Sequence, residues 1–253
     1  MSERTDGRAH DQIRPVSFEL GFTEVPDASV LTRMGRTTVL CTASVDERVP
    51  RWMDSPDNTA GWVTAEYAML PGSTSPRFRR ESMSGRVKGR TQEIQRLIGR
   101  SLRAVTILED LGPRTIRLDC DVLQADGGTR TASITGAFVA LAVATQDLLE
   151  RGLIETLPFR DTLAAISCGV VDGHALLDLP YEEDSAADVD MNVVMTGSGR
   201  YVEVQGTGEE ATFSDEEFTS LLTLAKKGVR DLTDAQLSAM PDELADTLRA
   251  IKG

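Results

Sequence analysis

Histidine and cysteine are scarce in this chain of 253 residues, which contains two histidines and three cysteines. Cys41, Cys120 and Cys168 form no Cys-x-x-Cys pair, and their odd number and wide spacing fit neither a disulfide framework nor a zinc site. So few histidines and cysteines also argue against a Ser-His-Asp or Cys-His catalytic arrangement. The sequence therefore predicts chemistry based on carboxylates, arginines and a metal ion.

Long apolar runs are also missing. No run reaches the ~18 residues that a membrane-spanning helix needs. The longest candidate, residues 134–145, is short and contains Gly136, so it predicts a buried helix. The polar N-terminal residues lack the apolar segment of a secretory signal. We therefore expect a cytoplasmic protein with no membrane partner.

Positive charge is low overall but concentrated in one segment. The net charge of −13 argues against a protein that coats nucleic acid along its whole surface. Residues 77–103 nevertheless hold nine Arg and Lys against two Glu, a local charge of +7, which leaves −20 on the remainder. This distribution indicates a protein that grips nucleic acid at one place.

The succession of apolar patterns predicts a mixed α/β fold, with residues 1–253 in a single domain. After a polar leader, strands are expected at residues 38–45, 62–70, 116–122, 164–171, 175–179, 191–195 and 201–205. Helices are expected at residues 91–105, after the glycine pair 127–128 through about 149, and from a capping box at 214–217 to Gly228. The acidic tail, about 233–253, predicts a loosely attached terminal helix. Strand pairs followed by helices indicate an α+β fold or a two-layer α/β sandwich.

Residues 116–136 predict a strand, a glycine turn and a helix in succession. Such a junction directs free backbone N–H groups and the positive end of a helix toward one spot. Gly127 and Gly128 allow a tight turn, and Arg130 adds a guanidinium fork that suits phosphate. The residue types alone therefore predict a phosphate or carboxylate site. The alternative is a plain tight turn followed by a surface arginine.

Arg90 follows Gly89 at the start of another predicted helix. A backbone turn and a guanidinium at this position suit the same kind of anion. The alternative is a solvated arginine on a helix surface.

Residues 178–190 contain six acidic residues and no basic one. Such a run is either a solvated loop or a source of oxygen ligands for Mg²⁺, which takes one or two carboxylates together with substrate phosphates and water. Spacing alone favours Asp188 and Asp190, because they share a face if the stretch is extended.

Arg77, Arg79 and Arg80 follow Pro76 in a stretch of low apolar content, with Phe78 among them. This stretch is either a mobile cationic loop without a partner or a surface that holds the RNA backbone, where each contact to phosphate adds salt-dependent affinity.

These segments closely resemble the ribonuclease PH family, which contains phosphate-dependent 3′-to-5′ exoribonucleases that trim transfer RNA precursors. The resemblance runs from about residue 11 to 233 and is carried by residues 64–71, 88–97, 116–136, 183–187, 190–195 and 203–207. It implies a two-layer α/β sandwich, related to that of ribosomal-protein and GHMP-kinase-like folds. It also implies a ring-shaped homohexamer built from three dimers.

The resemblance implies a role for each candidate residue. The residues that it assigns to inorganic phosphate are Arg90, Gly128, Thr129 and Arg130. It assigns Mg²⁺ or Mn²⁺ and catalysis to Asp184 and Asp190, and leaves Asp188 without a role. Arg77 and Arg80 match positions that hold the body of the transfer RNA, whereas Gly72 stands where the family often has another arginine.

The function that these assignments imply is phosphorolysis. Orthophosphate attacks the last 3′ phosphodiester of a transfer RNA precursor or another structured RNA, and a nucleoside 5′-diphosphate is released reversibly. One alternative is a catalytically silent RNA-binding ring subunit, although such relatives lose the arginines or carboxylates that this chain retains. Another is a small-molecule kinase with a similar sandwich, for which the chain offers no convincing glycine-rich nucleotide loop.

Overall fold

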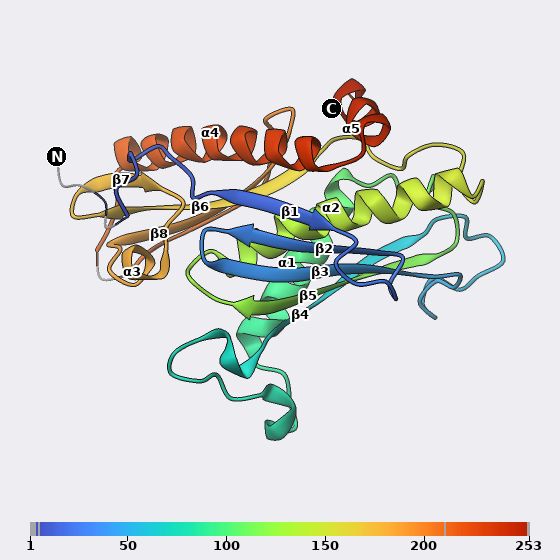
Figure 1. Ribbon diagram of the computed structural model, residues 1–253, viewed down its shortest axis with the longest axis horizontal. Coiled ribbons are helices and arrows are strands. Elements are labelled where there is room, and N and C mark those ends of the chain that lie inside the picture. The colour runs from blue at the N-terminus through green and yellow to red at the C-terminus, as the bar shows by residue number, and fades with distance from the viewer. Residues whose placement is uncertain (1–3, 5, 210, 252–253) are drawn as a thin grey trace.

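The computed structural model describes residues 4, 6–209 and 211–251, and it contains two β-sheets (Figure 1). The five-stranded sheet has the order β1-β2-β3-β5-β4, and β4 and β5 are parallel while the other neighbours are antiparallel. Its strands are β1 (Val16–Leu20), β2 (Ala28–Met34), β3 (Thr37–Asp46), β4 (Trp62–Met69) and β5 (Thr115–Gln124). The four-stranded antiparallel sheet has the order β7-β6-β8-β9. Its strands are β6 (Leu163–Val171), β7 (His174–Leu177), β8 (Val189–Thr196) and β9 (Tyr201–Gly208).

Helices connect and cover the two sheets. They are α1 (Gly89–Val105), α2 (Thr129–Glu150), the single turn α3 (Tyr181–Asp184), α4 (Asp215–Ala239) and α5 (Asp242–Ala250). Two short 3-10 turns, Pro71–Ser73 and Glu81–Ser84, lie in the segment between β4 and α1. Helix α1 makes the crossover that allows β4 and β5 to run parallel. Helix α4 extends along the four-stranded sheet (Figure 1). The predicted mixed α/β fold class is confirmed.

Helix α2 is the core of the molecule, because it contacts strands of both sheets. Its length and composition would suit a membrane span, but most of it is buried within the described fold, so its apolar character reflects its place in the core. Small residues let it approach the sheets closely. A Cβ atom at Gly136 would lie 2.8 Å from Cys41 Sγ and closer still to Thr32 Oγ1. One hydrophobic cluster therefore includes residues of both sheets and of α1, α2, α4 and α5.

Two strands of the first sheet, β1 and β2, lie before residue 38, where the sequence predicts only a polar leader. Strand β2 lacks a clear alternation, because Ser29 and Thr32 lie among its apolar residues and yet are buried. Strand β1 is a short edge strand. Strand β1 pairs with β2, and β2 pairs with β3, so both strands are defined by pairing across the sheet more than by their own residue pattern.

The predicted end of a helix at Gly228 and the loosely attached tail are wrong. Helix α4 continues to Ala239, and Gly228 lies in its interior, where a Cβ atom would sit 2.9 Å from Leu177 Cδ1. The glycine therefore permits close packing and does not end the helix. The tail is attached through α5, whose Leu244 and Leu248 are buried in the core. The capping box that opens α4 at Ser214 is present as predicted.

The contact at Gly136 generates a stability prediction. Gly136→Ala should destabilise the protein, because overpacking costs about 1–3 kcal/mol, more than the ~1 kcal/mol that alanine gains over glycine in a helix. Thermal unfolding should show a lower Tm, by about 2–4 °C for each kcal/mol lost. The control is Gly89→Ala at the start of α1, where a Cβ atom meets nothing within 4 Å. An unchanged Tm for Gly136→Ala would contradict the packing argument.

Candidate active site

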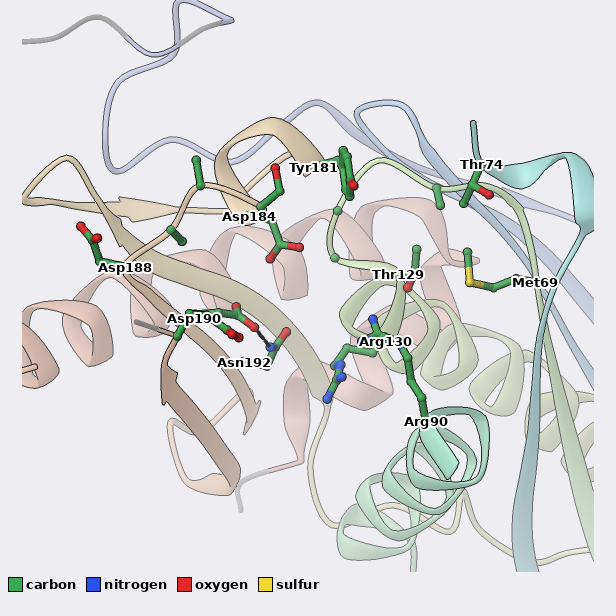
Figure 2. Close-up of a pocket in the computed structure, with 17 residues that line it drawn as sticks. Met69, Thr74, Arg90, Thr129, Arg130, Tyr181, Asp184, Asp188, Asp190 and Asn192 are labelled. Carbon is green, nitrogen blue, oxygen red and sulfur yellow. Dashed lines mark hydrogen bonds between the residues drawn. The ribbon is translucent and has the colours of Figure 1, made fainter. Parts of the chain in front are cut away.

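A pocket of about 710 Å³ lies where the loop before α2, the start of α1, α3 and the start of β8 meet (Figure 2). All the residues that the sequence analysis assigned to phosphate or to a metal ion line this pocket. They are Arg90, Gly128, Thr129, Arg130, Asp184 and Asp190. The structure thus brings together residues that lie up to a hundred positions apart in the sequence.

One wall of the pocket is built by the phosphate loop, residues 125–130, between β5 and α2. Gly127 and Gly128 both have positive φ values, of 72° and 65°, and Gly128 is the N-cap of α2. A Cβ atom at Gly127 would lie 2.8 Å from the carbonyl carbon of Pro180, so no side chain fits there. Because the first N–H groups of a helix have no partner within it, this loop turns backbone donors toward the pocket.

Two arginines complete this cationic wall. Arg90 of α1 and Arg130 of α2 both extend into the pocket (Figure 2). Arg130 is held in place, since its Nη1 donates to Gln205 Oε1 at 2.7 Å and to Glu93 Oε1 at 3.3 Å. Two positive charges in one pocket repel each other, and a bound anion relieves that repulsion. The wall therefore suits orthophosphate.

Tyr67 supports the same wall from β4. Its hydroxyl shares a hydrogen bond of 2.9 Å with Thr129 Oγ1, and both side chains are buried. Burial raises the pKa of Tyr67, although the bond to Thr129 and the charges of Arg90 and Arg130 act in the opposite direction. The neutral phenol thus fixes the orientation of the Thr129 hydroxyl.

The opposite wall is acidic. Asp184 comes from α3 and Asp190 from β8, and both carboxyl groups are half-buried. Burial first, and then the nearby Asp184 charge, raise the pKa of Asp190 to about 6, against the opposing charge of Arg130. Burial also raises the pKa of Asp184, against the charges of Arg90 and Arg130. Asp188 is exposed and points away from the other two (Figure 2).

The two carboxylates suit a hard divalent cation. Burial raises the pKa values of both groups, and the Asp184 and Glu209 charges add to the rise at Asp190, so a bound cation would favour the ionised carboxylates. No group of three or more His, Cys, Asp or Glu within the described part of the chain could hold a metal ion. A pair of carboxylates is nevertheless enough for Mg²⁺, which keeps several waters and binds substrate phosphates. Asp184 and Asp190 therefore fit this ion.

The chain also matches a known family along most of its length. Residues 12–146 match the 3′ exoribonuclease family, domain 1, and residues 161–228 match domain 2 of that family. Ribonuclease PH of Bacillus subtilis (strain 168) is 58% identical over 244 residues, which cover 96% of this chain and 99% of that protein. The chain belongs to the ribonuclease PH family. The predicted family and the predicted enzyme class, a 3′ exoribonuclease, are confirmed.

Other relatives agree with this membership. Ribonuclease PH of Corynebacterium glutamicum (strain R) is 60% identical over 237 residues, which cover 94% of this chain and 96% of that protein. The exosome of Archaeoglobus fulgidus, solved with RNA bound to the active site, has a chain that matches with a TM-score of 0.77 at 25% identity, covering 92% of both chains. Rrp46 of rice matches with a TM-score of 0.73 at 20% identity, covering 92% of this chain and 98% of that one, and shows the fold alone.

The two residues that the ribonuclease PH resemblance assigns to RNA do not line the pocket. Arg77 and Arg80 are exposed in the segment between β4 and α1, which projects from the first sheet (Figure 1). The Lys88 ammonium lies 4.6 Å from the centre of the Phe78 ring in the same segment. Thr74, also in this segment, lines the pocket. The basic loop (residues 72–88) is therefore continuous with the site.

Sequence reasoning assigned no role to Tyr67, Gln205 or Asn192. All three lie in segments that resemble the ribonuclease PH family, which was the only signal available for Tyr67 and Gln205. Asn192 lines the pocket two residues along β8 from Asp190 and donates to its two carboxylate oxygens at 3.3 and 3.5 Å. Tyr67 and Gln205 act through contacts with residues far away in the sequence, which composition and spacing do not encode. Asn192 acts on Asp190, two residues before it on the same strand.

The raised pKa of Asp190 generates a prediction about the metal-free protein. Between its ordinary value of 3.8 and about 6, the folded state binds more protons at this group than the unfolded state, so its contribution to stability falls as pH rises. Asp190→Asn removes the free-energy cost of ionising this half-buried carboxyl group in the folded state. The variant should raise the Tm of metal-free protein more at about pH 8 than at about pH 4.

Asp188→Asn is the matched control, because it makes the same change two positions away on an exposed side chain. It should leave the pH dependence of Tm as it is in the wild type. Equal effects of the two substitutions would contradict the assignment of the cost to burial at Asp190.

Proposed function

We propose that this protein is a phosphate-dependent 3′-to-5′ exoribonuclease that trims the 3′ ends of transfer RNA precursors. One observation carries the proposal: two arginines and two carboxylates lie on opposite walls of one pocket. An orthophosphate oxygen attacks the phosphorus of the last 3′ phosphodiester, and the bond from that phosphorus to the 3′ oxygen of the shortened RNA breaks. That oxygen takes up a proton, and a nucleoside 5′-diphosphate is released.

The cationic wall holds the attacking orthophosphate. Arg90 and Arg130 bind its oxygens from two helices, and the backbone N–H groups at the start of α2 add donors beside Gly128 and Thr129. Gln205 and Glu93 keep the Arg130 guanidinium in one orientation before phosphate binds. Holding the nucleophile in this way converts a reaction between two dilute solutes into one within a single complex.

The acidic wall faces the scissile phosphate. Asp184 and Asp190 would hold Mg²⁺ or Mn²⁺, which in its bound state neutralises charge on the scissile phosphate and on the leaving 3′ oxygen. Asn192 donates to Asp190 and limits the directions in which that carboxylate can turn. Within the described residues, the pocket lining contains no histidine or cysteine, which agrees with bound phosphate as the attacking group.

The basic loop binds the body of the transfer RNA. Arg77 and Arg80 are exposed there and free to contact backbone phosphates, which contribute affinity without reading sequence. The net charge of −13 on the whole chain disfavours contact with RNA elsewhere on the surface. RNA is therefore directed to the side of the molecule from which the pocket opens.

Three further features belong to the proposal. The domain is taken to span residues 1–253, an assignment supported by the hydrophobic cluster that links both sheets within the described residues. The protein assembles as a ring-shaped homohexamer of three dimers, an assembly supported by the likeness of its fold to exosome subunits. It works in the cytoplasm, where its three buried, unpaired cysteines stay reduced.

A silent RNA-binding ring subunit is the alternative function. Such a subunit has no need of a phosphate site or of paired carboxylates, yet this chain places both kinds of residue in one pocket. Family membership also argues against the kinase interpretation. The site therefore favours the enzyme.

The test of function uses an RNA with a short 3′ extension, with and without orthophosphate and Mg²⁺, and separates the released nucleotides. We expect nucleoside diphosphates only when phosphate is present. Nucleoside monophosphates released regardless of phosphate would show a hydrolase and overturn the mechanism. Binding without release would favour the silent subunit.

The phosphate assignment predicts a selective loss. Arg130→Lys keeps the charge but removes the planar fork, so the KM for orthophosphate should rise about 10- to 100-fold, in line with the 1.5–3 kcal/mol of a hydrogen bond to a charged group. Arg90→Ala should act in the same direction. The Kd for RNA should stay unchanged in both variants, and Arg96→Lys on the exposed surface of α1 is the control. Equal losses of phosphate and RNA affinity would contradict the assignment.

The basic loop predicts a change in salt dependence. The double variant Arg77→Ala/Arg80→Ala should bind a transfer RNA precursor more weakly, and the slope of log K against log salt should fall by about 1 for each RNA phosphate that an arginine no longer neutralises. Phosphorolysis of a short oligonucleotide should be unaffected. Arg151→Ala/Arg249→Ala removes the same charge from distant exposed positions and should bind normally. An unchanged slope in the loop variant would place the RNA body elsewhere.

A further inference from the structure

The segment before β1 carries three arginines, Arg4, Arg8 and Arg14, whose side chains are almost fully buried. All three contact the stretch that leads from β7 into α3, the helix that carries Asp184. We propose that Arg4 and Arg14 are positioning residues that fix the Asp184 carboxylate, and that Arg14 also fixes the phosphate loop relative to it. This assignment rests on the proposed function of the pocket.

Arg14 binds Asp178 at the beginning of that stretch. Its backbone N and its Nε donate to Asp178 Oδ2 at 2.7 and 3.0 Å, and its Nη2 donates to Oδ1 at 2.7 Å. Asp178 is a non-glycine residue with a positive φ of 56°, a conformation that costs energy and persists only where the surroundings fix it. The ion pair therefore sets the direction in which the chain leaves β7 toward α3.

Arg14 also reaches the phosphate loop. Its Nη1 donates to the carbonyl of Asp126, and a Cβ atom at Gly128 would lie 3.2 Å from its Nη2. The phosphate loop in turn packs directly on the start of α3, because Gly127 leaves no room for a side chain beside Pro180. Arg14 therefore donates hydrogen bonds both to Asp126 in the phosphate loop and to Asp178 before α3, the two segments through which the walls meet.

Arg4 acts on the acidic side alone. Its Nε and Nη2 donate to the two carboxylate oxygens of Glu183, at 3.1 and 2.6 Å, and Glu183 directly precedes Asp184 in α3. Its Nη1 and Nη2 also bind the carbonyls of Leu177 and Asp178, at 2.8 and 3.0 Å. A single guanidinium therefore ties both ends of the stretch that carries Asp184 to the N-terminal segment.

Stability alone does not explain this arrangement. Buried ion pairs cost desolvation, and well-packed apolar side chains in their place are often neutral or stabilising. What a planar, bidentate guanidinium adds is a fixed orientation of the carboxylate it binds. Here both bound carboxylates belong to the short segment that presents Asp184 to the pocket.

The test compares two double variants that remove each ion pair without leaving a lone buried charge. Arg4→Met/Glu183→Gln acts on the acidic wall alone. Arg14→Met/Asp178→Asn acts on both walls, and asparagine tolerates the positive φ at position 178. Arg4→Lys, which keeps the charge but loses the bidentate fork, is a milder third variant. Arg151→Met, at an exposed ion pair just after α2, is the control.

The readouts are Mn²⁺ binding, from the electron paramagnetic resonance signal of free Mn²⁺, and orthophosphate binding by calorimetry. Near-ultraviolet circular dichroism and Tm show whether each variant is folded. Arg4→Met/Glu183→Gln should weaken Mn²⁺ binding about 10- to 100-fold, the usual effect of losing a group that orients a metal ligand. Its orthophosphate Kd should stay at the wild-type value. Arg14→Met/Asp178→Asn should weaken both, and Arg4→Lys should fall between wild type and its double variant for Mn²⁺.

A folded Arg4 variant that binds Mn²⁺ as tightly as the wild type would overturn the assignment. So would equal losses of Mn²⁺ and phosphate binding in the Arg4 variants, which would indicate a general structural role. If the wild type itself binds neither Mn²⁺ nor orthophosphate, the proposed function fails and this assignment fails with it. The two failures are thus told apart by the wild-type measurement.

Discussion

The contact between the phosphate loop and the start of α3 determines how far apart the two walls of the pocket lie. It is a backbone contact, possible because Gly127 has no side chain, and the buried pair of Arg14 and Asp178 closes it from the N-terminal side. The five-stranded sheet leads into the cationic wall through β5, and the four-stranded sheet leads into the acidic wall through β7 and β8. Any shift of one sheet against the other would change the distance between the cationic wall and the acidic wall. Helix α2, packed between the sheets and opening at the phosphate loop, limits that shift.

Opposed charges give the pocket its chemical character. Arg90 and Arg130 favour an anion between them, while the acidic wall holds two carboxylates whose pKa values are raised by burial. Either wall alone would be a strained cluster of like charges. In the proposed reaction, orthophosphate offsets the charge of the cationic wall and a divalent cation would offset that of the acidic wall. The repulsion between like charges on each wall is therefore relieved fully only when every reactant is bound. Catalysis depends on such interactions being most favourable in the reacting complex.

Local patterns were sufficient to predict much of the fold. The alternation in β5, the apolar composition of α2 and the capping box at Ser214 each depend on neighbouring residues and agree with the structure. The inward-facing Arg4 and the role of Gly228 depend on partners far away in the sequence. Strands β1 and β2 were missed because they are defined by strand pairing and lack a clear apolar alternation. Spacing alone favoured Asp188 because it assumed an extended strand, whereas β8 begins at Val189 and leaves Asp188 exposed. Asp184 was assigned by the family resemblance alone, since a one-turn helix carries no periodicity, and it lines the pocket.

The central claim is that orthophosphate, held on the cationic wall, is the group that attacks the RNA. The most direct measurement supplies orthophosphate labelled with ¹⁸O at all four oxygens and determines the mass of the released nucleotide. If orthophosphate attacks, the nucleoside diphosphate carries all four labelled oxygens, one of them in the bridge between its phosphates. A released nucleotide without label, or with label acquired only from H₂¹⁸O, would contradict the account.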